Sequence, residues 1–323
     1  MSAPAVETRD LVREFKGGIR AVDGVSLVVE SGGIFGFLGP NGAGKSTTVR
    51  MLTTLLRPTG GTAMVAGYDV VADPDAVRRR IGVALQDAAI DPYMTGRELL
   101  RLQGVLHGLP RAACRARADD LLARVGLEDA ADRRVGTYSG GMRRRLDLAL
   151  SLVHEPVVLF LDEPTTGLDP TSRVTLWEEV RRLNAEHGTT IFLTTQYLEE
   201  ADQLADRVAI IDGGRIVADG APGALKAEIG EPLLTVTAGE GCSADDIAAV
   251  LSRFGSIVPG SVDHGAGVRL PGGSSAMADA VRALDDAGVR FQSIDLAEPT
   301  LDDVFLKCTG RHLEGAGDEV PAA

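Results

Sequence analysis

The sequence has few cysteines and no long apolar run. Cys114, Cys242 and Cys308 are its only cysteines, and they lie far apart with no CxxC or histidine spacing. We therefore expect ordinary thiols of a reducing cytoplasm, and neither a disulfide framework nor a zinc site. No apolar run approaches the ~20 residues of a membrane-spanning helix, and the acidic amino-terminal residues do not have the pattern of a signal peptide. We expect a soluble chain, whose membrane span, if one is needed, comes from another protein.

The sequence also has fewer basic than acidic side chains. The 46 acidic side chains against 33 Lys and Arg give a formal net charge of −13 at pH 7. A chain of this charge is not attracted to nucleic acid or to anionic lipid, so we predict no nucleic-acid partner. A hydrophobic content of 44% is typical of a globular protein, and 323 residues suit two domains of ordinary size.

A phosphate-binding motif, G-x-x-x-x-G-K-[ST], begins at Gly39. It consists of Gly39, Pro40, Asn41, Gly42, Ala43, Gly44, Lys45, Ser46 and Thr47. The apolar residues 34–38 before it predict a buried strand, and residues 45–56 predict a helix. Backbone N–H groups at the start of that helix would cradle the phosphates of ATP, with Lys45 on the β- and γ-phosphates and Ser46 on Mg²⁺. The alternative is a glycine-rich turn without a ligand, since the chain has 39 glycines.

Two adjacent carboxylates follow the most apolar strand candidate, residues 157–161. Asp162 and Glu163 at the end of a buried strand are costly unless a cation meets them. We therefore predict that Asp162 holds Mg²⁺, through water, and that Glu163 orients and deprotonates the water that attacks ATP. A solvated strand end is the alternative, and the tight polar return at residues 164–169 argues against it.

Two single positions have weaker local signals. Phe15 lies just before a glycine turn, where an aromatic ring either stacks on adenine or packs in the core; its local sequence favours core packing. Gln86 ends the apolar run of residues 81–85. It contacts either Mg²⁺ or the attacking water, or it is a solvated side chain at a strand end.

Residues 95–152 have apolar positions at helical spacing and no strand-like run, which predicts a helical insertion into an α/β chain. Within it, Ser139, Gly140 and Gly141 open a helix that carries three consecutive arginines. Small residues with free N–H groups at a helix start form an anion site, although Ser-Gly-Gly caps also occur without a ligand.

The order of these motifs resembles that of the ATP-binding-cassette (ABC) ATPases over residues 5 to about 220. The family's Walker A loop, glutamine loop, signature, Walker B strand and D-loop match residues 39–47, 86, 138–142, 157–163 and 167–169. The resemblance implies an α/β P-loop NTPase domain over residues 1–220, with a RecA-like core, an antiparallel β subdomain and a helical subdomain at about residues 90–153. It implies that Phe15 stacks on adenine. It also implies a homodimer, in which Ser139, Gly140 and Gly141 of one subunit complete the ATP site of the other.

Within that family the chain is similar to ATP-binding subunits of the daunorubicin-resistance type, which pair with a separate membrane permease. The similarity lies in residues 138–147, 194–202 and 299–306. It implies export of a hydrophobic drug or lipid, from the cytoplasmic face of the membrane. The alternatives are a cassette ATPase that acts on ribosomes or nucleic acid, and a nucleotide-dependent module without transport activity.

Three residues depart from the broad cassette pattern: Tyr138 and Met142 in the signature, and Gln196 in place of the histidine that senses the γ-phosphate. We assign Gln196 a catalytic role beside Lys45 and Glu163. A glutamine amide can donate to a phosphate oxygen but cannot carry a charge. We therefore predict a slower ATPase, with little pH dependence arising from this position.

Residues 221–312 contain no phosphate motif and predict a small α+β domain. The predicted elements follow a βαββαβ order, which indicates a ferredoxin-like fold, and residues 300–309 predict a closing helix. We expect this domain to dimerise, to regulate, or to brace the permease, and residues 313–323 to form a disordered tail.

Overall fold

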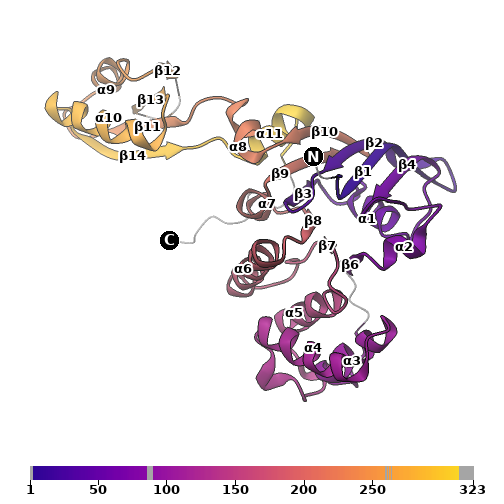
Figure 1. Ribbon diagram of the computed structural model, residues 1–323. Coiled ribbons are helices and arrows are strands. Elements are labelled where there is room, and N and C mark those ends of the chain that lie inside the picture. Colours follow the sequence, from indigo (N-terminus) through magenta and orange to yellow (C-terminus); the bar gives the residue numbers. More distant parts are fainter. Residues whose placement is uncertain (1–2, 86–89, 259, 261, 263, 313–323) are drawn as a thin grey trace. The chain divides into compact units, whose positions relative to one another are not determined.

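The chain divides into two compact units in the computed structural model, which describes residues 3–85, 90–258, 260, 262 and 264–312 (Figure 1). The first unit contains the described residues up to Pro222 together with residues 308–312, and the second is Gly223–Lys307. Two clusters of buried apolar side chains form the core of the first unit, and a third forms the core of the second.

A six-stranded sheet forms the centre of the first unit, in the order β10-β9-β3-β8-β7-β6. Its strands are β3 (Ile34–Leu38), β6 (Ile81–Ala84), β7 (Val158–Asp162), β8 (Thr190–Thr195), β9 (Arg207–Asp212) and β10 (Arg215–Gly220). All neighbours are parallel except β9 and β10. Every residue of β3, β7 and β8 is buried, which explains why these strands are continuous apolar runs in the sequence.

A second, antiparallel sheet has the order β2-β1-β4-β5. It is built from β1 (Val6–Phe15), β2 (Ile19–Val29), β4 (Gly60–Val65) and β5 (Tyr68–Asp69), and it confirms the sheet expected from residues 5–30. Phe15 ends β1 and is 39% exposed, and the Arg13 guanidinium lies 4.8 Å from its ring centroid. The local expectation that Phe15 packs in the core is therefore wrong, and its role in adenine stacking stays a prediction.

The remaining helices of the α/β part are α1 (Lys45–Leu52), α2 (Pro74–Arg78), α6 (Pro170–His187) and α7 (Leu198–Leu204), with α8 (Pro222–Ala227) at the unit boundary. Helix α1 is four residues shorter than expected, because Thr54 has a φ of 63°, outside the helical region. Helix α6 starts at Pro170 because Asp169 caps it, accepting from the Ser172 N–H at 3.0 Å, and Pro170 fits its first turn. In the described part of the chain, no helix is both long and apolar enough to cross a bilayer.

A cluster of helices lies between β6 and β7 in the sequence (magenta in Figure 1). It contains α3 (Gly96–Leu106), α4 (Arg111–Arg124), α5 (Gly140–Ser151) and the 3-10 turns Glu128–Ala130 and Val135–Thr137. Helix α3 opens with a capping box, in which Thr95 Oγ1 accepts from the Glu98 N–H at 3.2 Å and Glu98 Oε2 accepts from the Thr95 N–H at 2.9 Å. The predicted helical insertion is confirmed.

The second unit is a four-stranded antiparallel sheet with two helices packed into its core. Its sheet order is β12-β13-β11-β14. In sequence the elements are β11 (Leu233–Ala238), α9 (Ala244–Leu251), β12 (Ser256–Val258), β13 (Gly265–Arg269), α10 (Ser274–Asp286) and β14 (Phe291–Ala297), followed by α11 (Leu301–Thr309). This is the split βαβ arrangement of a ferredoxin-like fold, so the predicted α+β fold is confirmed.

Candidate active site

The carboxyl ends of three adjacent parallel strands meet at the candidate site. Strand β8 lies between β3 and β7, with Thr195 level with Leu38 and Thr194 level with Asp162. Gly39 and Gln196 directly follow β3 and β8, and Asp162 ends β7. The fold therefore places the phosphate-binding loop, the carboxylate pair and Gln196 along one edge of the sheet, where ligands of open α/β sheets bind.

Two positions of the phosphate-binding loop have room only for glycine. A Cβ at Gly39 would lie 2.2 Å from the backbone oxygen of Ile211, and one at Gly44 would lie 2.4 Å from that of Ala21. Gly44 also has a φ of 111°, a conformation that residues with a side chain rarely adopt. The loop thus depends on glycine for its close approach to strands on either side.

Helix α1 begins at Lys45 with no side-chain cap, so its first N–H groups are left for an anion. The Lys45 ammonium folds back over the loop, donating to the backbone oxygens of Gly39 at 2.7 Å and Pro40 at 3.2 Å. This arrangement is suited to phosphate, since a buried cation and free N–H groups face the same loop.

The carboxylate pair lies against the start of this helix. Glu163 Oε1 is 3.2 Å from Lys45 Nζ, and both side chains are buried. Ser46 Oγ donates to Asp162 Oδ1 at 3.2 Å. The predicted residues of Walker A and Walker B are therefore in direct contact, although 116 positions separate Ser46 from Asp162.

The oxygen atoms of Ser46 and Asp162 fit a hard cation such as Mg²⁺, which takes oxygen ligands. In the described ranges no group of three or more His, Cys, Asp or Glu side chains is placed to hold a metal ion. Mg²⁺ is commonly held by one or two protein oxygens together with the phosphates of its nucleotide. The donor set is consistent with an ion that arrives with ATP.

Thr194 is a site residue that the sequence analysis missed. Its hydroxyl donates to Asp162 Oδ1 at 2.5 Å and accepts from the Glu163 N–H at 3.0 Å. Glu163 itself has a φ of 49°, in the left-handed region. Thr194 therefore holds the carboxylate of Asp162 and the backbone of Glu163. The sequence signal for this residue is the pair of threonines, Thr194 and Thr195, at the end of a strongly apolar strand.

The signature turn caps helix α5. Ser139 Oγ accepts from the Met142 N–H at 3.2 Å, and Gly140 and Gly141 form the first helical positions. Gly140 also lines a cavity of about 450 Å³ together with Arg144, Glu163 and Gly167. The turn is thus on the same side of the first unit as the carboxylate pair.

Tyr138 replaces the usual leucine without loss of burial. Its ring packs in the core of the helical cluster, and its hydroxyl donates to the Ala130 carbonyl at 2.6 Å. Burial raises the pKa of this hydroxyl. The substitution is accommodated because the buried hydroxyl has an acceptor.

Gln196 is half-buried directly after β8, and Gln86 lies outside the described residues.

A further buried group, Glu200 of α7, was not expected. Glu200 Oε1 accepts from Trp177 Nε1 at 3.1 Å, and burial raises the pKa of this carboxyl. Glu200 therefore links α7, which begins shortly after Gln196, to α6, the helix that follows the D-loop.

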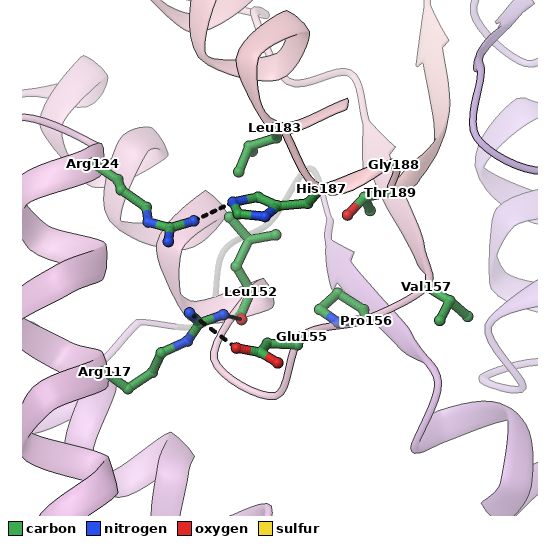
Figure 2. A pocket seen from close by; sticks show the side chains of 10 residues that line it. All are labelled: Arg117, Arg124, Leu152, Glu155, Pro156, Val157, Leu183, His187, Gly188 and Thr189. Carbon is green, nitrogen blue, oxygen red and sulfur yellow. Dashed lines mark hydrogen bonds and ion pairs between the residues drawn. The ribbon is translucent and has the colours of Figure 1, made fainter. Parts of the chain in front are cut away.

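A separate pocket of about 330 Å³ lies at the opposite ends of β7 and β8, and Figure 2 shows the residues that line it. Val157 and Thr189, which directly precede these strands, are among them. Its basic groups are already paired within the chain: Arg124 donates to His187 Nε2 at 2.5 Å, and Arg117 lies 3.3 Å from Glu155. Since nucleotides bind at the carboxyl ends of parallel strands, this pocket is not the candidate site.

Comparison with known proteins gives consistent matches. The ABC transporter family model matches residues 22–166. The daunorubicin/doxorubicin resistance ATP-binding protein DrrA of Streptomyces peucetius is 48% identical over 98% of this chain and 96% of its own length. The doxorubicin resistance ATP-binding protein DrrA of Mycobacterium tuberculosis is 44% identical over 91% and 90%. The Nod factor export ATP-binding protein I of Paraburkholderia xenovorans is 40% identical over 94% and 97%.

Solved structures agree with the sequence matches. CbiO1 of Clostridium perfringens, part of an ABC transporter complex, has a TM-score of 0.65 and 28% identity, covering 70% of this chain and 92% of its own. A dimeric ATP-binding cassette in a post-hydrolysis state with ADP and Pi has a TM-score of 0.62 and 25% identity, covering 67% and 98%. The predicted P-loop NTPase fold is confirmed, and the chain is a nucleotide-binding ATP hydrolase. It belongs to the ABC transporter family of ATP-binding proteins, which includes the daunorubicin-resistance proteins.

Proposed function

We propose that this chain drives the export of a hydrophobic drug or lipid through a separate membrane permease, to which it attaches at the cytoplasmic face. One observation supports ATP hydrolysis: beside the uncapped start of α1, Lys45 contacts Glu163 and Ser46 contacts Asp162. The cargo part is supported by the names of the relatives, which are resistance proteins for daunorubicin and doxorubicin and an exporter of Nod factor.

The phosphates of ATP lie over the first N–H groups of α1, with Lys45 on the β- and γ-phosphates. Ser46, and Asp162 through water, would hold Mg²⁺, and we assign Gln86 to the same ion. When bound, the ion neutralises charge that develops on the phosphates. The exposed ring of Phe15 stacks on adenine.

Glu163 orients the attacking water and takes its proton, since its carboxylate reaches into the site beside the lysine. Gln196 donates to a γ-phosphate oxygen through its amide. The carbonyl and amide of Gln196 have no charge to lose, so this contact contributes no titration between pH 6 and 8.

The site is completed by a second subunit. Ser139, Gly140 and Gly141 donate to the γ-phosphate bound by the partner, which stabilises charge in the transition state only when the dimer closes. The open surroundings of Gly140 support this role, since a Cβ there would meet no described atom within 4 Å, whereas Gly141 packs against Ser172. A dimer is also the form of one similar cassette structure.

The permease is expected to bind beside α3. Leu102, Val105 and Leu106 of this helix are exposed apolar residues. A groove of about 420 Å³ next to them is lined by Leu55 and Ile90, among others. We expect movement at the nucleotide to pass to the permease through residues 86–93, of which residues 90–93 are described.

The test is Glu163→Gln. The variant should bind MgATP, accumulate dimers in light scattering and release no phosphate; a monomeric variant with parental turnover would refute the shared site. Co-purification from the native host separates the functions. A membrane protein with several spans supports transport, ribosomes or nucleic acid support the first alternative, and ATP binding without phosphate release supports the second.

A further inference from the structure

Arg144, in the second turn of α5, binds backbone on both sides of Glu163. Its guanidinium donates to the Asp162 carbonyl at 2.8 Å and to the Pro164 carbonyl at 2.9 Å. A third bond, of 2.7 Å, reaches the Leu85 carbonyl, directly before Gln86. One side chain therefore connects the signature helix to the ends of two strands of the central sheet.

A guanidinium in this position is costly to bury. The side chain is 11% exposed, and burial lowers the pKa of Arg144. The three carbonyls and the Asp147 carboxylate, 3.2 Å away, are what satisfy it.

The backbone that Arg144 grips is in an unfavourable conformation. Glu163 has a φ of 49°, in the left-handed region that residues with a side chain usually avoid. Anchors at the preceding and following carbonyls fix this conformation from one side, and the Thr194 hydroxyl on the Glu163 N–H fixes it from the other. The direction of the Glu163 carboxylate thus depends on Arg144.

Helix α5 also carries the signature turn at its amino end, five residues before Arg144. We propose that Arg144 is a positioning residue that sets Glu163 of its own subunit, and that it links contact of Ser139 with the partner's nucleotide to hydrolysis in its own site. This inference rests on the proposed roles of Glu163 and of the dimer.

Arg145 offers a matched control on the same helix. Its guanidinium also donates to backbone carbonyls, those of Val125 at 2.8 Å and Gly126 at 3.4 Å, and both lie within the helical cluster. Loss of Arg145 therefore removes bonds of the same kind without touching the strand that carries Glu163.

The experiment compares Arg144→Gln with Arg145→Gln in the full-length protein, by kcat, KM for ATP and melting temperature. Arg144→Gln should lower kcat by about 10²-fold, the effect of misplacing a catalytic group by an ångström, and leave KM within about threefold. Arg145→Gln should lower the melting temperature but keep kcat. An Arg144→Gln effect confined to KM, or a kcat no lower than that of Arg145→Gln, would overturn the inference.

A double-mutant cycle tests whether Arg144 acts through Glu163. Glu163→Gln blocks steady-state turnover, so the cycle follows the slow residual ADP formation of enzyme in excess over ATP. Adding Arg144→Gln should slow this residual rate by no more than about twofold, since the group that Arg144 positions is already gone. If the fold-losses in rate of the two single variants multiply in the double variant, the two residues act independently and the proposal is wrong. If Arg144→Gln does not fold, Arg144→Lys replaces it in both experiments. The same loss of kcat is expected, because one ammonium cannot bridge the carbonyls of Asp162 and Pro164. A parent protein without ATPase activity would instead refute the proposed function itself.

Discussion

Glu163→Gln should tighten nucleotide binding as well as stop turnover. The Lys45 ammonium lies 3.2 Å from Glu163 Oε1, and the two side chains are 3% and 6% exposed. A bound phosphate needs the same ammonium, so it competes with the glutamate for Lys45. Glutamine occupies the same space but carries no charge, and the competition is reduced.

The size of the effect follows from the geometry. Two unit charges at this distance attract by about 5 kcal/mol at an effective dielectric constant of 20, and desolvation of the two buried ions offsets much of this. Lys45 also keeps its bonds to the Gly39 and Pro40 carbonyls. We expect a net gain of about 1.5 kcal/mol, the size of a hydrogen bond to a charged group, or about tenfold in Kd.

The assay is calorimetric titration with MgADP, which lacks the γ-phosphate that the partner's signature turn would clamp. Dimer closure then contributes nothing to the measured affinity. Glu199→Gln, an exposed change on α7, is the control for the loss of one negative charge. A Kd for Glu163→Gln equal to or weaker than that of the parent would refute the competition.

Three further changes test other parts of the site. Burial raises the pKa of Asp147 to about 6, so the stability that this group contributes is fully present below about pH 4 and is lost as pH rises through 6. In urea titrations, the unfolding free energies at pH 5 and pH 8 should therefore differ by about 1–2 kcal/mol less in Asp147→Asn than in the parent. An equal difference in the two proteins would contradict the raised pKa of Asp147. Gln196→His should raise kcat at saturating ATP and add a pH dependence near neutrality; equal turnover at every pH would show that Gln196 does not limit the rate. Gly44→Ala should abolish MgADP binding in calorimetry, whereas Gly67→Ala, with a φ of 82° and open space around it, should not. Parental affinity in Gly44→Ala would mean that the loop tolerates a Cβ.

Most of the central sheet could be predicted because its strands are buried on both faces. A strand of this kind is a continuous apolar run, and the polar residue that ends it marks the ligand edge. Asp162 and Glu163 are identified in this way, whereas Lys45 is identified from the phosphate-binding motif and Gln196 from the resemblance to the cassette family. The pattern is local, so one sequence is enough to read it.

The supporting residues could not be predicted, because their roles depend on register and packing. Thr194 meets Asp162 only because β7 and β8 pair in one particular register. The bonds of Arg144 reach Leu85 and Pro164, 59 and 20 positions away, in different elements. The sequence shows an arginine in a helix, and its carbonyl partners have no sequence signature.

Mixing two inactive variants tests the shared site most directly. Subunits with Lys45→Ala keep the signature turn, and subunits with Ser139→Ala keep the phosphate-binding loop. In a mixed dimer one of the two sites then has Lys45 from one subunit and Ser139 from the other, both intact. We predict that the mixture hydrolyses ATP at about a quarter of the parental rate, since about half of the dimers are mixed and each has one working site. A mixture no more active than the mean of its two components would contradict the account.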